Sequence, residues 1–359
     1  MNSARRPAIR FSMFDWLDES GRGYAATYDE RLKVIESADR LGFHAYLLAE
    51  HHGTSLSQTP SPTIFLSAVA QRTERIRLGA LTWCLPLYHP IRLLEELCML
   101  DQLSHGRLEL GVGRGVSPHE SVRMGIAPEE TKERFQEMLK LLIGGFTTGE
   151  LRLDGRFYKY DGVKTRFRTV QKPYPPMWYP TSSMDNMPWI AAQGFNVVVS
   201  LLHSPSFDRA CEMLARYRED WRAHRNDASR ANAHVAEPEV AFTTHIHVAE
   251  TDQRALDQAR TAYSQFHENF TRRYIEIGQG DKYANRPSFD QFVARSQILC
   301  GSPDTVRGIL AGHLAKSGAN HFIGAFTFGS LGLEECRRSI ELFGREVIPA
   351  LQDGAKAPA

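Results

Sequence analysis

Long apolar runs, a charge excess of either sign and paired cysteines are all missing from this sequence of 359 residues. No apolar stretch approaches the roughly 20 residues that a membrane-spanning helix needs, so we expect no membrane partner. Lysine and arginine number 43 and aspartate and glutamate 42, a balance that predicts no nucleic-acid partner. Three arginines near the N-terminus are followed by no apolar segment, so we expect no secretory signal.

The five cysteines are scattered, and no two of them form a C-x-x-C pair. We therefore predict neither a disulfide framework nor a zinc site, and we expect a cytoplasmic location. The sequence also lacks a G-x-G-x-x-G motif that opens a helix after the first predicted strand. This absence argues against a dinucleotide-binding doubly wound sheet.

The sequence does contain a regular alternation of short apolar strands and amphipathic helices. Strands are predicted at 9–14, 45–49, 76–81, 108–112, 177–179, 196–200, 240–248 and 320–325. Alternation along a whole chain favours a parallel α/β sheet, and eight strands favour a closed (β/α)8 TIM barrel over an open doubly wound sheet. Excursions interrupt the pattern at 149–176, before strand 5, and at 279–301, before strand 8. We expect a single barrel domain over 1–351 and a frayed tail over 352–359.

Polar or glycine-rich segments follow four of these strands. Glu50-His51-His52 follows the second strand and Leu81-Thr82 the third, while Gly113-Arg114-Gly115 follows the fourth and Thr181-Ser182-Ser183 the fifth. In a (β/α)8 barrel the C-terminal strand ends meet on the face that carries the active site. The sequence therefore predicts that the four segments form one site.

Three of the four segments also have an alternative explanation. An acid and two histidines can bind a metal, but adjacent histidines on an extended chain point apart and no third ligand is close in sequence. Gly113-Arg114-Gly115 is either a plain turn or a place where a guanidinium binds an anion beside a planar ligand. Thr181-Ser182-Ser183 is either a helix N-cap or a phosphate cradle. An arginine beside a set of hydroxyls suits a ligand with one phosphate arm.

A larger set of motifs resembles the bacterial luciferase-like flavin-dependent monooxygenases (alkanal monooxygenase-like). The resemblance covers nearly the whole chain, is weakest in the two excursions, and implies the same barrel. Its C-terminal part lies in Gly301-Ser302-Pro303 and in 343–351. The other motifs that carry it are Leu48 to His52, Leu85 to Pro90, Glu95-Glu96, Leu100 to Arg107 and Gly111 to Gly115.

The resemblance implies roles for the residues at the strand ends. His51 matches the family's catalytic acid/base over the flavin, with His52 and Glu50 in support. Leu81-Thr82 matches a non-prolyl cis peptide beneath the isoalloxazine ring. Arg114 matches the arginine that holds the FMN phosphate.

A three-residue segment and one glycine complete the predicted site. Thr181, Ser182 and Ser183 fall in the family's phosphate segment. Gly113 stands where the light-emitting subunit has a reactive cysteine, so the resemblance implies oxygenation without light emission.

The activity that the resemblance implies is that of a two-component FMN-dependent monooxygenase. A separate NAD(P)H:flavin reductase would supply reduced FMN (FMNH2), which reacts with O2 to a C4a-hydroperoxyflavin that oxygenates a small organic substrate. A homodimer is expected, with 95–107 at its interface. An F420-dependent oxidoreductase, a non-catalytic flavin-binding partner subunit and a metal-dependent barrel hydrolase stay open as alternatives. The sequence does not distinguish hydroxylation, Baeyer–Villiger insertion and carbon–heteroatom cleavage.

Overall fold

The strands of the computed structural model, which describes residues 8–115, 117–276, 278–283 and 285–354, close into a parallel barrel. Each strand of the wall pairs in parallel with the next, and the last one pairs with β1. The predicted (β/α)8 barrel is therefore confirmed. The wall consists of β1 (Arg10–Asp15), β2 (Ala45–Leu48), β3 (Arg77–Cys84), β4 (Leu108–Gly113), β7 (Met177–Thr181), β8 (Asn196–Ser200), β9 (Val240–Val248) and β11 (His321–Thr327).

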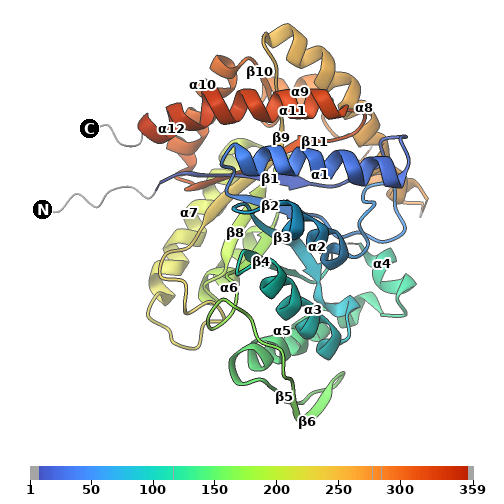
Figure 1. The fold of residues 1–359 in the computed structure, drawn as a ribbon, viewed down its shortest axis with the longest axis vertical. Coiled ribbons are helices and arrows are strands. Elements are labelled where there is room, and N and C mark those ends of the chain that lie inside the picture. Colours follow the sequence, from blue (N-terminus) through green and yellow to red (C-terminus); the bar gives the residue numbers. More distant parts are fainter. Residues whose placement is uncertain (1–7, 116, 277, 284, 355–359) are drawn as a thin grey trace, which may run out of the picture.

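Helices surround the barrel wall, as Figure 1 shows. Three of them begin with proline, at Pro62, Pro90 and Pro303, where a missing N–H costs no hydrogen bond. The outer helices are α1 (Tyr24–Arg40), α2 (Pro62–Arg72), α3 (Pro90–Leu103), α5 (Thr131–Thr148), α6 (Met187–Ala192), α7 (Phe207–His224), α8 (Asp252–Ile275), α10 (Pro303–Ser317), α11 (Leu333–Leu342) and α12 (Ile348–Gly354).

The C-terminal boundary differs slightly from the expected one. α12 continues to Gly354, because the π-helical segment η5 (Phe343–Val347) passes from α11 into α12 without an interruption. Helix therefore extends into the start of the predicted frayed tail 352–359. Residues 355–359 lie outside the described ranges.

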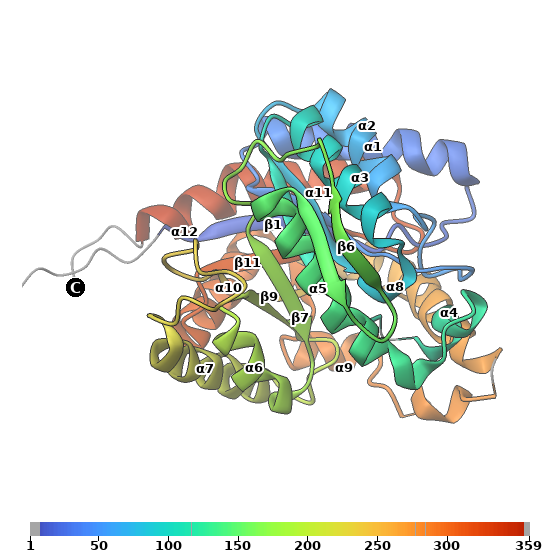
Figure 2. The same ribbon diagram turned by 90° about the horizontal axis from the view of Figure 1, so that it is seen from below.

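The first excursion forms an antiparallel hairpin, β5 (Glu150–Asp154) and β6 (Lys159–Lys164), that lies beside α5 (Figure 2). The hairpin turn is fixed to this helix, because the buried Glu137 carboxylate accepts the backbone N–H groups of Arg156, Phe157 and Tyr158 at 2.7–3.1 Å. The second excursion contains η4 (Gly280–Tyr283), α9 (Phe289–Ala294) and β10 (Leu299–Gly301), which extends the sheet beside the end of β9.

The inside of the barrel is filled by small and medium apolar side chains. Close packing there explains a glycine in β4: a Cβ at Gly111 would lie 2.1 Å from the Ala80 carbonyl oxygen of the neighbouring strand. The larger part of the core lies between the strands and the helices. The interior side chains are Phe14, Ala45, Leu47, Ala49, Leu81, Trp178, Val198, Ala241, Ile323 and Ala325.

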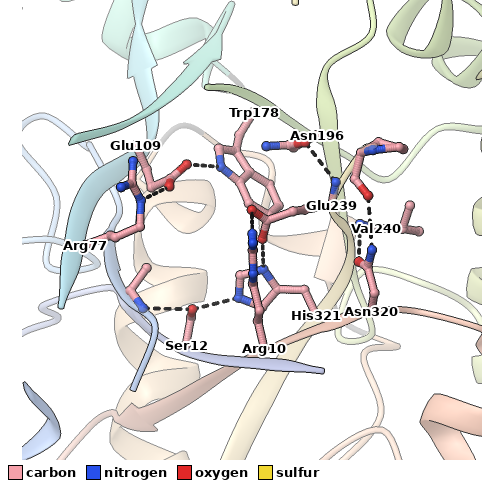
Figure 3. A network of polar contacts seen from close by, with 12 residues as sticks. Arg10, Ser12, Arg77, Glu109, Trp178, Asn196, Glu239, Val240, Asn320 and His321 are labelled. Atoms are coloured by element: carbon pink, nitrogen blue, oxygen red, sulfur yellow. Dashed lines mark hydrogen bonds and ion pairs between the residues drawn. The ribbon is translucent and has the colours of Figure 1, made fainter. Parts of the chain in front are cut away.

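A network of paired charges closes the N-terminal end of the barrel (Figure 3). His321 is bonded to Glu239 at 2.6 Å and to Ser12 at 2.7 Å, and Glu239 also pairs with Arg10. These contacts serve stability, as the N-terminal face of such barrels generally does. The polar segments that follow the strands lie at the opposite end, where such barrels carry their active sites.

Candidate active site

His51 is held by a carboxylate at the C-terminal end of β2. Its Nδ1 lies 3.0 Å from Oε1 of Glu120, and both side chains are buried. Glu120 belongs to the short helix α4 (Pro118–Arg123), which follows the glycine-rich segment after β4. Sequence reasoning assigned Glu120 no role, because only the fold brings it to His51 from the strand end two places along the wall.

Trp16 stacks on the ring of His51. The two ring centroids are 5.8 Å apart and the planes differ by 11°. Trp16 follows β1, and its ring also contacts Phe14 edge-on at 5.0 Å and Phe266 of α8 at 6.0 Å. The histidine is therefore fixed on one side by an acid and on another by an apolar ring.

Glu50 is bonded to protein groups through both of its carboxylate oxygens. Oε1 lies 2.9 Å from Nε2 of His52, and Oε2 accepts the Cys84 N–H at 3.0 Å and the Tyr88 hydroxyl at 2.9 Å. Burial lowers the pKa of His52, but the hydrogen bond and charge of Glu50 outweigh it, so the net shift is upward. The pair thus links the rim of β2 to the end of β3.

The peptide bond between Leu81 and Thr82 is cis, as the family resemblance implied. Leu81 points into the barrel interior with the other core side chains of that group. Thr82 lies against β4, where a Cβ at Gly113 would come within 2.4 Å of its Oγ1. Packing against Thr82 therefore explains why position 113 carries no side chain.

Arg114 extends from the end of β4 and is exposed. It lines a hollow of about 70 Å³ together with the hydroxyl-bearing residues Ser117, Ser121 and Thr131. Burial raises the pKa of Tyr179 in β7, and the nearby Arg114 guanidinium offsets part of that shift. A cation beside several hydroxyls is a suitable environment for an anion.

The segment Thr181-Ser182-Ser183 leaves the sheet beside Arg114, because β4 and β7 are neighbours with Gly111 opposite Trp178. The Thr181 hydroxyl oxygen accepts the Ser183 N–H at 3.1 Å and an Asn186 side-chain N–H at 3.0 Å. Thr181 therefore stabilises the turn before η3 (Met184–Asn186). The hydroxyls of Ser182 and Ser183 make no hydrogen bond with a described residue, which leaves them available to a ligand.

Taken together, the strand ends bring all four predicted segments to one face of the barrel. His51 and Glu120 form one part of it, Glu50 and His52 a second, and the Arg114 region a third. Within the described ranges, no three His, Cys, Asp or Glu side chains are grouped as they would be around a metal ion. No helix in those ranges is long and apolar enough to cross a bilayer.

Two proteins of known sequence resemble the chain over most of their length. Protein y4wF of Sinorhizobium fredii, whose function is uncharacterized, is 35% identical over 327 residues, covering 91% of this chain and 92% of that protein. The oxygenase component of the flavin-dependent trigonelline monooxygenase of Acinetobacter baylyi is 27% identical and covers 96% of each chain.

Solved structures share the fold at lower identity. The oxygenating constituent of 3,6-diketocamphane monooxygenase of Pseudomonas putida, in complex with FMN, has a TM-score of 0.79 at 20% identity and covers 95% of this chain and 98% of its own. The F420-dependent tetrahydromethanopterin reductase of Methanopyrus kandleri has a TM-score of 0.71 at 17% identity, with 96% and 99% covered. The model of the luciferase-like monooxygenase family matches residues 9–321. The chain belongs to the luciferase-like monooxygenase family and is a flavin-dependent monooxygenase.

Proposed function

We propose that the protein is the oxygenase component of a two-component monooxygenase that uses reduced FMN and O2 to oxygenate a small organic substrate. The observation that carries the proposal is the His51–Glu120 pair, buried at the active-site end of the barrel. A buried histidine that is hydrogen-bonded to a carboxylate is suited to general acid–base catalysis.

The donor groups near Arg114 fit FMN, which carries a single phosphate. The Arg114 guanidinium makes no ion pair with a described residue, and the hydroxyls of Ser182 and Ser183 at the neighbouring strand end are not used within the fold. These groups would hold the phosphate. The cis peptide Leu81–Thr82, packed on Gly113, would lie under the ring system. Reduced FMN supplies two electrons and the site at which O2 is activated.

The protein's part in the reaction is to position groups, exclude water and move one proton. Glu120 accepts the Nδ1–H of His51, which makes Nε2 the atom that donates and takes up a proton. The Trp16 ring shields one face of the imidazole from water. Glu50 and His52 keep the rim of β2 in register with β3 and act as positioning residues.

The proposed function requires a partner that reduces the flavin. A separate NAD(P)H:flavin reductase would supply FMNH2, as the designation "oxygenase component" of the trigonelline enzyme suggests for that protein.

We also propose a homodimer through α2 and α3, where Ile64, Met99 and Leu103 are exposed apolar side chains on two helices that pack together. Light scattering should then give twice the chain mass, and Met99→Asp should lower it toward that of a monomer. A monomeric native protein would contradict the dimer.

The test of the cofactor is a pair of anaerobic titrations with FMNH2 and reduced F420. We expect tight binding of FMNH2 and weak binding of F420; the reverse result would identify an F420-dependent oxidoreductase.

The test of the activity combines the protein with FMN, NADH and an unrelated flavin reductase. Small organic compounds are screened for oxygenated products by mass spectrometry, with 18O2 as the label. Incorporation of one labelled oxygen atom supports the proposal. Flavin binding without any product, even with the reductase present, would favour a non-catalytic partner subunit, and stoichiometric metal on elemental analysis would favour a metal-dependent hydrolase.

A further inference from the structure

Arg286 is a largely buried cation without an anionic partner. It lies between η4 and α9, and its Nε and Nη2 atoms are both buried and unbonded. No carboxylate of the described residues forms an ion pair with it. The guanidinium carbon lies instead 4.2 Å from the ring centroid of Phe270 and 5.5 Å from that of Phe292. Because a charge removed from water without a partner is strongly destabilising, this arrangement calls for an anion.

Two further buried polar groups, His245 and Tyr263, lie beside Arg286. The side chain of His245, in β9, is 1% exposed, and its Nε2 has no hydrogen bond. Burial lowers the pKa of His245 well below its ordinary value and the charge of Arg286 lowers it further, so the imidazole is neutral. The Tyr263 hydroxyl is also buried. Burial raises the pKa of Tyr263, and the charge and hydrogen bonding of the neighbouring Arg286 offset part of that rise; the Tyr263 ring lies 5.9 Å from that of His245.

A row of aromatic rings connects these groups to the proposed catalytic histidine. The ring of Trp16, stacked on His51, contacts Phe266 at 6.0 Å. Phe266 in turn contacts His245 at 4.3 Å and Phe270 at 6.2 Å, and Phe270 lies under Arg286. Arg286, His245 and Tyr263 thus lie at the far end of an apolar wall that begins at His51.

We propose that Arg286, His245 and Tyr263 form the recognition subsite for an aromatic carboxylate, the substrate class of this enzyme. Nε and Nη2 lie on one edge of the guanidinium, and this edge can bind both oxygens of a carboxylate. The neutral imidazole and the phenol can each donate a further hydrogen bond. A flat ring between the carboxylate and His51 would pack on the aromatic wall. The inference rests on the proposed function, which makes His51 the end at which oxygen is transferred.

Arg286 could bind either a substrate carboxylate or the flavin phosphate. The following experiment distinguishes these two anions. The full-length protein is titrated calorimetrically with benzoate, salicylate and 2-naphthoate and with the corresponding amides, in the presence and absence of FMN. We expect at least one carboxylate to bind at least tenfold more tightly than its amide. Arg286→Gln should remove that preference, a loss of about 10- to 100-fold in carboxylate affinity, while FMN affinity stays unchanged.

Two further variants control the result. Arg286→Lys should restore part of the carboxylate affinity, because it keeps the charge but loses the two-pronged contact. Arg295→Gln, an exposed arginine of the same excursion, should change nothing. Equal binding of acids and amides by the native protein, or unchanged carboxylate affinity in Arg286→Gln, would overturn the subsite. A loss of FMN but not carboxylate affinity in Arg286→Gln would reassign the arginine to the flavin. Because binding is measured without turnover, absence of monooxygenase activity would count against the proposed function and leave this test intact.

Discussion

Replacing Glu50 tests whether this carboxylate serves the fold or the flavin. The family resemblance implied that Glu50 supports His51 at the flavin, but both of its carboxylate oxygens are hydrogen-bonded to protein groups. In Glu50→Ala the Cys84 N–H and the Tyr88 hydroxyl lose their acceptor in an interior that little water reaches. At about 1–3 kcal/mol for each unsatisfied donor, the free energy of unfolding should fall by about 2–6 kcal/mol. His52 adds less, because its side chain is 15% exposed and can bind water.

Glu50→Gln is the more discriminating variant. The amide keeps one oxygen for Cys84 and Tyr88 and can donate to a neutral His52, so the loss should be about 1–2 kcal/mol. For a chain of this length, 1 kcal/mol corresponds to about 1–2 °C in Tm. We therefore expect a Tm decrease of a few degrees in Glu50→Gln and of roughly 3–10 °C in Glu50→Ala. Glu36→Gln, which removes a partly exposed ion pair with Arg72, should cause little change.

Thermal denaturation followed by circular dichroism, and flavin titration at a temperature where each variant is folded, complete the assay. FMN affinity of folded Glu50→Gln should be within about twofold of the native value, because none of the three hydrogen bonds involves the ligand. The native protein should also lose stability as the pH rises above 6.5, since a histidine with a raised pKa stabilises the fold only while protonated. Glu50→Gln should weaken this dependence. An unchanged Tm together with a tenfold loss of FMN affinity would refute the reasoning and return Glu50 to the flavin.

Three further substitutions test other parts of the molecule. His51→Ala should keep FMN affinity but lower product yield by about 10²–10⁴-fold, with hydrogen peroxide released instead, measured as product and peroxide per NADH; an unchanged yield would exclude His51 as the proton-transfer group. Arg114→Ala should raise the Kd of FMN by about 10- to 100-fold and leave that of riboflavin nearly unchanged, and equal losses for both would place Arg114 away from the phosphate. Burial raises the pKa of Asp18 from 3.8 to about 6, so the native protein should lose stability as the pH rises through this interval, whereas Asp18→Asn should show a flatter profile in urea denaturation and be up to about 3 kcal/mol more stable at pH 7. A steeper profile in the variant would contradict the assignment.

The barrel was predictable from the sequence because its signals are local. Strands at 45–49 and 196–200 are short apolar runs bounded by polar residues, and proline or a Ser/Thr cap marks the start of several helices. The start of α7 has such a local signal, because its N-cap Ser206 accepts the Arg209 N–H. Local periodicity does not predict the structure of the two excursions. Their contacts are made with residues elsewhere in the chain, such as Glu137.

The site was predictable only where residues follow a strand directly. His51 and Arg114 could be placed from the strand ends, and the cis bond at Leu81–Thr82 from the family resemblance. Glu120 could not, since nothing in its own segment indicates that it would contact a histidine from another strand end. The sequence also could not show that Glu50 accepts a hydrogen bond from the Cys84 N–H. Every residue except proline has a backbone N–H, so the residue type at position 84 does not reveal this contact.

The two ends of the barrel differ in how their buried charges are paired, and this difference points to function. At the N-terminal end Arg77 pairs with Glu109, which also accepts the Trp178 indole N–H at 2.7 Å, so these charges are compensated within the fold (Figure 3). Near the C-terminal end, Arg286 and His245 have buried nitrogen atoms without partners. A fold that satisfies its buried ions at one end and leaves a cation unpaired at the other gains stability from the first and binding capacity from the second. We expect a ligand to supply the missing anion. Arg286 lies beyond Trp16 and Phe266, whereas Arg114 lines the hollow at the end of β4 that we propose for the flavin phosphate, so the carboxylate of the substrate is the better match for Arg286.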